Sequence, residues 1–215
     1  MDEAPEFAVN VIDALRQPLE SGTVVVSRAA QTAVFPARFQ LVLAANPCPC
    51  GYSGSVVERC ECTPVQRRRY GDKISGPVRD RIDLHRVLRA PTHPELVESL
   101  TSRRSSGRWA EDVGEARERQ GRRLEPHGAR LNSEIAGVVI RKELPPTPPA
   151  RAVLEQQLQG GKLSARAADR VLRVAWTVAD LVGHQQPDDE DVGTALALRR
   201  GTSIGGALRE QLGAA

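Results

Sequence analysis

An almost uninterrupted apolar run restricts the fold of the first part of the chain more than any other feature. Phe39–Ala45 contains one polar residue and stops at Asn46-Pro47. Strands of a parallel sheet have such runs because both of their faces are buried. The run therefore predicts a buried parallel strand, and Ile82–Leu88 is a second candidate strand. Together they indicate an α/β sheet.

A hairpin is predicted upstream of the apolar run. Thr23–Ser27 and Thr32–Phe35 are rich in β-branched and aromatic residues, and Arg28–Gln31 separates them. Two short runs of this kind joined by a few residues are typical of a β-hairpin.

Helical spacing precedes the hairpin. Val11, Leu15 and Leu19 recur at intervals of four, and Asn10 and Pro18 are candidate boundary residues. This pattern predicts one helix before the hairpin.

The last part of the chain shows helical periodicity alone. Ser164 is a candidate N-cap for a helix whose apolar face includes Val171, Val174, Val178 and Leu181. Further helices are expected over Asp188–Arg199 and Ser133–Glu143, the latter ending before a proline-rich segment. We therefore predict three regions, namely an α/β region over 1–90, a polar connection with a helix over 91–130 and a helical bundle over 131–215.

Composition indicates a globular protein of the cytoplasm. Apolar residues make up 40% and charged residues 27% of the 215 residues. No run approaches the roughly 18 apolar residues that span a bilayer, so no membrane contact is expected. The N-terminus lacks a secretory signal. A net charge of +3 does not establish a nucleic-acid partner, and 3% aromatic residues argue against binding by base stacking.

The cysteines form a compact motif. Cys48, Cys50, Cys60 and Cys62 have the spacing C-x-C-x9-C-x-C. In a reducing compartment, four converging thiolates suit one Zn²⁺ better than two disulfides. Such a zinc would be structural, because four protein ligands leave no open position. Reduced thiols without a metal are the alternative interpretation.

Acidic and amide side chains stand at predicted strand ends. Asp2 and Glu3 are adjacent, and such a pair can divide the work of holding Mg²⁺ on a nucleotide and orienting the attacking water. Solvated acids near a terminus are the alternative. Asn46 follows the apolar run, where its amide can reach a γ-phosphate or can form an Asx turn before Pro47.

Two arginines are candidates for contacts with phosphate. Arg81 lies between Asp80 and Asp83, and it can either neutralise a neighbouring subunit's γ-phosphate or form an ordinary surface ion pair. Arg166 lies in the first turn of its predicted helix, where the helix dipole disfavours a cation unless an anion is near. An exposed arginine screened by water is the alternative for Arg166.

Several of these motifs occur together and in one order, and this combination resembles a known family. The chain is similar to the magnesium-chelatase-like AAA+ ATPases of the ComM/YifB type. The residues that carry the resemblance are Asp2–Phe7, Leu15–Gly22, Phe35–Val42, Asn46–Gly51, Ser75–Pro77, Asp80–Leu84 and Leu163–Ala167.

The resemblance implies a partial P-loop NTPase core, from the Walker B strand onward, with a C-terminal helical lid. Asp2 and Glu3 match the Walker B acids that act on Mg²⁺ and water. Asn46 matches the sensor-1 residue, Arg81 the arginine finger that acts on ATP in the adjacent subunit, and Arg166 the sensor-2 arginine.

The resemblance also implies partners. The predicted hairpin matches an insertion that faces the central channel of related hexameric helicases, which makes Arg28 a candidate DNA contact. Members of the family are expected to form rings and to act on DNA as helicase or branch-migration motors in recombination or natural transformation.

One departure from the family concerns nucleotide binding. The sequence contains no G-x-x-x-x-G-K-[ST] motif, so the phosphate cradle and its lysine are missing. We therefore expect the chain to come from a truncated, split or misannotated gene, and the chain alone to lack ATPase activity. The alternatives are a non-enzymatic module that binds DNA or a partner, and a chelatase-type subunit for metal insertion.

Overall fold

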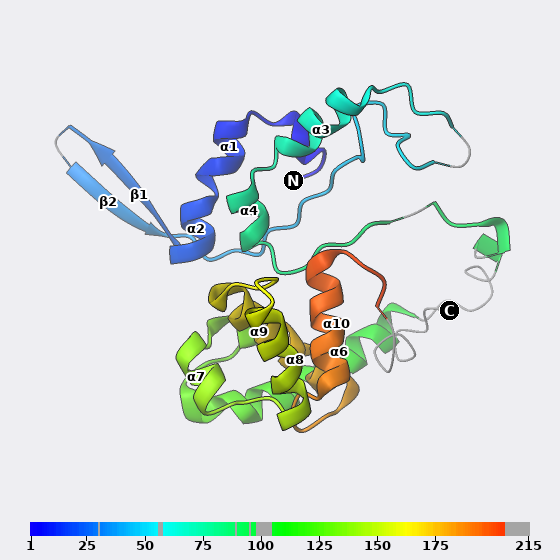
Figure 1. The fold of residues 1–215 in the computed structure, drawn as a ribbon. Helices are drawn as coiled ribbons and strands as arrows, with labels where there is room; N and C mark the ends of the chain where they lie inside the picture. Colours follow the sequence, from blue (N-terminus) through cyan, green and yellow to red (C-terminus); the bar gives the residue numbers. More distant parts are fainter. Residues whose placement is uncertain (30, 56–57, 89, 95, 98–104, 205–215) are drawn as a thin grey trace. The chain divides into compact units, whose positions relative to one another are not determined.

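The chain forms two compact units in the computed structural model, unit 1 (Met1–Ile82) and unit 2 (Asp83–Ala215) (Figure 1). The structure describes residues 1–29, 31–55, 58–88, 90–94, 96–97 and 105–204. No helix among these residues is long and apolar enough to cross a membrane.

Unit 1 combines short helices with one strand pair. Its elements in chain order are the 3₁₀ turn η1 (Ala4–Glu6), α1 (Val9–Ala14), α2 (Arg16–Ser21), β1 (Thr23–Arg28), β2 (Gln31–Pro36), α3 (Pro64–Asp72) and α4 (Gly76–Arg81). A strand pair followed mostly by helices is consistent with the predicted order of an α/β region and a helical region.

The hairpin prediction is confirmed. β1 and β2 pair antiparallel, with Val24 opposite Phe35 and Val25 opposite Val34. The hairpin extends away from the helices of unit 1 (Figure 1). Val34 and Phe35 are 62% and 53% exposed, so the hairpin is held by its backbone ladder and cross-strand pairs more than by burial.

The prediction of a single helix before the hairpin is wrong in detail. The segment is divided into α1 and α2, and the residue before α1 is Ala8, not Asn10. Pro18 has no N–H to donate to the carbonyl of Ala14, so an unbroken helix would lose a hydrogen bond at that point.

The two strand predictions are wrong as well. Within the described chain, neither Phe39–Ala45 nor Ile82–Leu88 is assigned as a strand. Phe39 and Val42 are 46% and 66% exposed, so the apolar run is not buried on both faces. The reason is that strand assignment and burial both require neighbouring elements, and the described residues supply only a short backbone pairing on one side of this run.

Unit 2 is helical. Its elements are α6 (Ser106–Leu124), the 3₁₀ turns η2 (Glu125–His127) and η3 (Asn132–Glu134), α7 (Gly137–Lys142), α8 (Pro148–Gln159), α9 (Ala165–Val182) and α10 (Asp189–Arg200). Helix α9 lies against α6, α7, α8 and α10. It therefore forms the centre of the unit.

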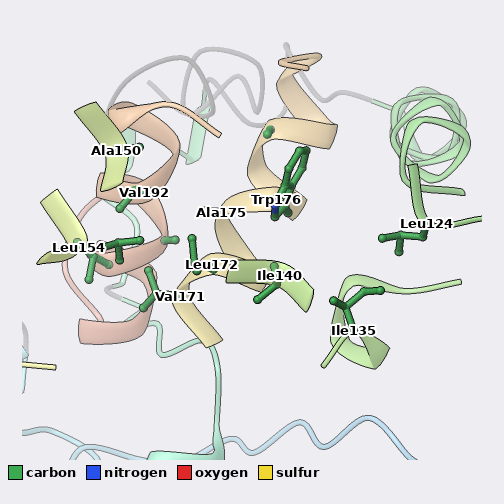
Figure 2. Close-up of a cluster of buried hydrophobic side chains, with 13 residues drawn as sticks. Leu124, Ile135, Ile140, Ala150, Leu154, Val171, Leu172, Ala175, Trp176 and Val192 are labelled. Atoms are coloured by element: carbon green, nitrogen blue, oxygen red, sulfur yellow. The ribbon is translucent and has the colours of Figure 1, made fainter. Parts of the chain in front are cut away.

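The hydrophobic core of unit 2 surrounds α9 (Figure 2). Trp176 is 3% exposed, and its indole N–H donates to the carbonyl of Leu144 at 3.0 Å. The full cluster comprises Leu124, Ile135, Ile140, Ala150, Leu154, Val171, Leu172, Ala175, Trp176, Ala179, Val192, Ala195 and Leu196. Most of these side chains recur at helical spacing on α9 and α10, as an amphipathic helix requires.

The predicted N-cap of α9 is confirmed, and the helix expected over Asp188–Arg199 is also found. The Ser164 hydroxyl accepts a hydrogen bond from the Ala167 N–H, which caps α9. Asp188 caps α10 through a capping box with Asp191. Such caps satisfy backbone N–H groups that have no partner within the helix.

The helix predicted over Ser133–Glu143 is divided. Residues of its first turn form η3, and α7 begins only at Gly137. The Glu134 carboxylate accepts hydrogen bonds from the backbone N–H groups of Arg130 and Leu131, at 2.8 and 3.2 Å. This local turn competes with a continuous helix.

Candidate functional site

The start of the chain runs parallel to the end of the apolar run. The Met1 amino group donates to the carbonyl of Val42 at 2.8 Å, and the Ala44 N–H donates to the carbonyl of Met1 at 3.0 Å. The Ala4 N–H then donates to the carbonyl of Ala44 at 2.8 Å. The first two bonds follow the parallel pattern, and the third is displaced by one residue at the left-handed Glu3. The two segments therefore run side by side in the same direction over a short stretch.

The acidic pair and the amide predicted for the site lie in or just after these two paired segments. Asp2 and Glu3 lie within the first segment, and Asn46 lies two residues after the paired Ala44. All three residues are exposed. Carboxylates and an amide on two neighbouring segments are a suitable set for a hydrated Mg²⁺–phosphate group.

Glu3 has a strained backbone. Its φ and ψ are 48° and 43°, and among the described residues it is the one non-glycine residue with a positive φ. A left-handed conformation costs a non-glycine residue about 1–2 kcal/mol. The Asp2 carboxylate, which accepts from the Glu3 N–H at 2.9 Å, helps to hold it. Strain of this kind is often found at functional sites.

Sequence reasoning missed a small group beside the acids. Tyr70 on α3 is 5% exposed, and burial raises the pKa of its phenol, with a further contribution from the carboxylates of Glu6 and Glu3. Lys73 lies 3.8 Å from Glu6 and 5.7 Å from the centre of the Tyr70 ring. Lys73 and Tyr70 belong to no motif of nucleotide chemistry, so no local signal singled them out.

Arg81 is held inside unit 1. Its guanidinium donates to the carbonyl of Pro77 at 2.8 Å and forms an ion pair with the carboxylate of Glu20 on α2. Its side chain is only 15% exposed. The alternative interpretation from sequence named Asp80 or Asp83 as the partner. The structure shows Glu20 as a further partner of Arg81. The two residues are 61 positions apart, so no local sequence pattern predicts the pair.

The helix that carries Arg81 is anchored at its start. The Ser75 hydroxyl, in the residue before α4, donates to the carboxylate of Asp13 on α1 at 2.6 Å. Arg79 donates to the carbonyls of Ile74, at 2.9 Å, and Gly71. These contacts connect α4 with α1 and with the end of α3, so the orientation of Arg81 depends on all three helices.

The four cysteines converge. All four sulfur atoms lie within 4.8 Å of one another. Cys48 Sγ lies 3.3 Å from Cys50 Sγ and 3.7 Å from Cys60 Sγ, and Cys50 and Cys60 are 3.6 Å apart. A hydrogen bond from the backbone of Tyr52, with contributions from neighbouring thiols, lowers the pKa of the Cys50 thiol to about 6. At neutral pH this cluster therefore offers a thiolate to a soft metal ion.

Arg28 and Arg166 lie in different units. Arg28 is the exposed last residue of β1, next to the hairpin turn. Arg166 is exposed in the first turn of α9 in unit 2, as predicted. The structure therefore brings the cysteines to one point, and it pairs the backbone beside Asp2 and Glu3 with the segment that precedes Asn46. Their chemical roles, and those of the arginines, stay predictions.

Comparisons with known proteins match nearly the whole chain. A family model described as magnesium chelatase, subunit ChlI, matches residues 1–96. A second model, described as magnesium chelatase, subunit ChlI C-terminal, matches residues 103–199.

Relatives in several bacteria have similar sequences. An uncharacterized protein of Mycobacterium tuberculosis is 41% identical over 93% of this chain and 39% of its own length. The competence protein ComM of Haemophilus influenzae is 40% identical over 93% of this chain and 38% of its own length. The uncharacterized protein YifB of Escherichia coli is 37% identical over 94% of this chain and 38% of its own length.

These matches settle the family but cover only part of its members. The chain spans less than two fifths of the length of the relatives that it matches. Both family models and the relatives agree with the motifs found in the sequence, so this chain belongs to the magnesium-chelatase-like family of the ComM and YifB type.

Proposed function

We propose that this chain contributes the hydrolytic residues, the arginine finger and the lid to an ATP-driven motor that acts on DNA. The observation that carries the proposal is the parallel backbone pairing of Met1 and Ala4 with Val42 and Ala44. It supports a shared site for Asp2, Glu3 and Asn46. In the proposal, Asp2 holds the Mg²⁺ of ATP, Glu3 activates the attacking water and Asn46 contacts the γ-phosphate.

The phosphate cradle of this motor lies in polypeptide outside the 215 residues. The sequence has no G-x-x-x-x-G-K-[ST] motif, so we expect the isolated chain to show no ATP turnover. Saturable hydrolysis by this chain that disappears in Glu3→Gln would contradict the expectation. Sequencing of the gene upstream then tests the motor itself. An in-frame phosphate-loop motif supports it, and its absence favours a non-enzymatic module that binds DNA or a partner.

The finger assignment is tested by mixing subunits of the longer polypeptide. Arg81→Ala should lower ATP hydrolysis on the order of a thousandfold or more and leave nucleotide binding intact. Glu3→Gln should also abolish hydrolysis. A mixed ring contains both variants. The Glu3→Gln subunit still has Arg81, and this arginine can act on ATP held by a neighbouring Arg81→Ala subunit, which still has Glu3. Part of the ATP hydrolysis should therefore return.

A matched arginine controls this experiment. Arg68 on α3 has a side chain that is 86% exposed, and Arg68→Ala should leave hydrolysis unchanged. If mixing restores no activity although mixed rings form, Arg81 does not act between subunits. Equal loss of binding and hydrolysis in Arg81→Ala alone would likewise reject the finger, because the side chain would then act only through the fold of its own subunit.

DNA is the proposed substrate and the hairpin its contact. Arg28 stands exposed at the end of β1, and the relative from Haemophilus influenzae is named a competence protein, which agrees with a role in DNA uptake or recombination. A ring of six subunits, as in related motors, would direct such hairpins at a central channel. Titration of a DNA duplex should therefore show weaker binding by Arg28→Ala, and a slope against salt reduced by about one.

A control arginine on the other unit sharpens the DNA test. Arg151→Ala on α8 changes the net charge by the same amount at an exposed position. Identical losses for both variants would indicate unspecific attraction by net charge, and would remove Arg28 as a defined contact.

The family description favours one second candidate. Both family models are described as parts of magnesium chelatase, which would make the chain part of a subunit that drives metal insertion into a tetrapyrrole. Insertion of Mg²⁺ into a porphyrin by the longer polypeptide, without any stimulation of ATP hydrolysis by DNA, would support this candidate over the DNA motor.

A further inference from the structure

The four-cysteine cluster has the dimensions of a site for one metal ion. Four sulfurs at about 2.3 Å from a tetrahedral Zn²⁺ lie about 3.8 Å from one another. The separations among Cys48, Cys50 and Cys60 are 3.3, 3.7 and 3.6 Å, and the Cys62 sulfur lies within 4.8 Å of all three. A disulfide would require about 2.05 Å. The cluster is therefore close to the geometry of a mononuclear tetrathiolate centre.

The backbone around Cys48 is arranged for a thiolate. The Ser53 N–H donates to Cys48 Sγ at 3.3 Å, and the Gly51 N–H donates to the carbonyl of Cys48 at 3.0 Å. Gly51, the last residue of this turn, has a φ of +82°, which glycine adopts without strain. N–H groups that point at a ligating sulfur orient it and stabilise its negative charge.

The described part of the segment around the cluster is held by local turns. Among the described residues from Pro47 to Cys62 there is no helix or strand. Cys48 itself is fully buried. Because few apolar side chains are buried nearby, a cross-link through the sulfurs is the main interaction that can hold this segment in one conformation.

We propose that Cys48, Cys50, Cys60 and Cys62 bind one Zn²⁺, and that the loaded site fixes Asn46 relative to α3. Those thiols that are still protonated release their protons to solvent as four zinc–sulfur bonds form, so no redox step is involved. All positions around the ion are filled by protein, so the zinc is structural. The metal-binding step stands independently of ATP chemistry, and only the consequence for Asn46 rests on the proposed function.

The positions of the ligands explain this role. Cys48 lies two residues after Asn46, and Cys62 directly precedes Thr63, the N-cap of α3. Thr63 and Gln66 form a capping box that fixes the start of α3. Zinc therefore connects the end of the segment that pairs with Met1–Ala4 to the helix that carries Tyr70.

Metal content and Co²⁺ substitution test the site. Protein purified under reducing conditions without chelator should contain one zinc per chain. Co²⁺ added to the metal-free protein should give the intense visible bands of a tetrahedral tetrathiolate. Cys60→Ser should lower Zn²⁺ affinity by on the order of 100-fold or more, whereas Cys60→His, which restores a zinc ligand, should recover much of it.

Several results would overturn the proposal. These are protein that is folded yet binds neither Zn²⁺ nor Co²⁺, a Co²⁺ spectrum of octahedral type, or equal metal affinity of Cys60→Ser and the unaltered chain. Iron in place of zinc would retain the tetrathiolate centre but reject the assigned metal. Because these measurements use no nucleotide, they can fail while the ATPase proposal stands, and the reverse also holds.

Hydrogen exchange tests the role of the site. Removal of zinc should speed amide exchange in residues 42–70 at least tenfold and leave exchange in α9 and α10 unchanged. If exchange changes only within residues 47–62, zinc orders its own loop and does not fix Asn46 or α3. If amide exchange in β1 and β2 speeds up as much as in residues 42–70, removal of zinc has unfolded the whole of unit 1. That result would contradict a role confined to Asn46 and α3.

Discussion

The two units of the chain are stabilised in different ways. In unit 2, thirteen buried residues form one cluster around α9. In unit 1, the buried apolar side chains among the described residues are Ala4, Pro5, Ile12, Cys48, Tyr70 and Val78. Many of its large apolar side chains are exposed instead, among them Phe7, Val11, Val34, Phe35, Phe39 and Val42.

This difference indicates which interactions stabilise the fold of each unit. Burial of apolar surface dominates the stability of most domains, and unit 2 follows this rule. Unit 1 depends more on individual polar contacts, such as the Arg81–Glu20 ion pair, the Ser75–Asp13 hydrogen bond and the parallel backbone pairing at Met1. Substitutions should therefore act through packing in unit 2 and through single contacts in unit 1.

The largest expected effect is on the core of unit 2. Trp176→Ala should lower the free energy of unfolding by about 3–5 kcal/mol, because it leaves a cavity and removes the hydrogen bond to Leu144. Urea unfolding followed by circular dichroism measures this. Val138→Ala, at a half-exposed position on α7, should change it by no more than about 0.5 kcal/mol. An equal loss of stability in Val138→Ala would show that burial in the core does not decide the size of the effect.

A buried ion pair gives the next effect. Asp180 is 2% exposed and forms an ion pair with Arg123, whose guanidinium also stacks 3.9 Å from the Trp176 ring. Asp180→Asn should destabilise unit 2 by about 3 kcal/mol, since the Arg123 charge loses its buried partner. The same change at Asp169, whose partner Arg141 is half exposed, should cost about 1 kcal/mol or less. Equal costs in urea unfolding would show that burial does not decide the difference.

A smaller effect is expected in unit 1. Glu20→Gln removes the charged partner of Arg81 and should destabilise unit 1 by about 1–2 kcal/mol. Amide exchange in α2 and α4 measures this locally. Glu155→Gln on α8 makes the same change at an exposed position of unit 2 and serves as the control. No change in α4 exchange would mean that Glu20 does not hold Arg81.

The smallest effect is a pH dependence between α9 and α10. His184 Nδ1 lies 2.9 Å from a carboxylate oxygen of Asp191, and this hydrogen bond raises the pKa of His184. Burial of the ring has the opposite, smaller effect on the pKa. Asp188 and Glu190 add negative charge near the ring. Because the folded pKa lies above the usual 6.5, the stabilisation is complete below pH 6.5 and is lost as pH rises through the folded pKa.

His184→Gln isolates this contribution. The difference in urea midpoint between the unaltered chain and the variant should shrink as the pH rises above 6.5. The difference between the two proteins cancels the titration of groups that do not contact His184, including that of the cysteines. A difference that stays constant, or grows with pH, would contradict the sign of the His184 shift.

Sequence reasoning succeeded where local chemistry decides the structure. The hairpin follows from β-branched runs, and the start of α9 follows from Ser164, because a cap acts within one turn. Membership of the family follows from motifs that are contiguous in sequence. The convergence of the cysteines also follows from their close spacing, although no observation yet tests which metal they bind.

The failures concern interactions between distant residues. An apolar composition predicts burial of Phe39–Ala45, but burial requires covering elements that the described residues do not supply. The Arg81–Glu20 pair and the Ser75–Asp13 bond join residues about sixty positions apart. The left-handed backbone of Glu3 has no sequence signal at all, since glutamate rarely adopts it.

The pairing of Met1 with Val42 has a consequence for the order of folding. It joins residues 41 positions apart, so its formation requires closure of a long loop, and loop closure is entropically costly. The hairpin lies inside that loop and has only local contacts, so it can form within microseconds and shorten the effective loop. The pairing beside Asp2, Glu3 and Asn46 is therefore expected to assemble late, after the hairpin, and a destabilised hairpin turn should slow its appearance.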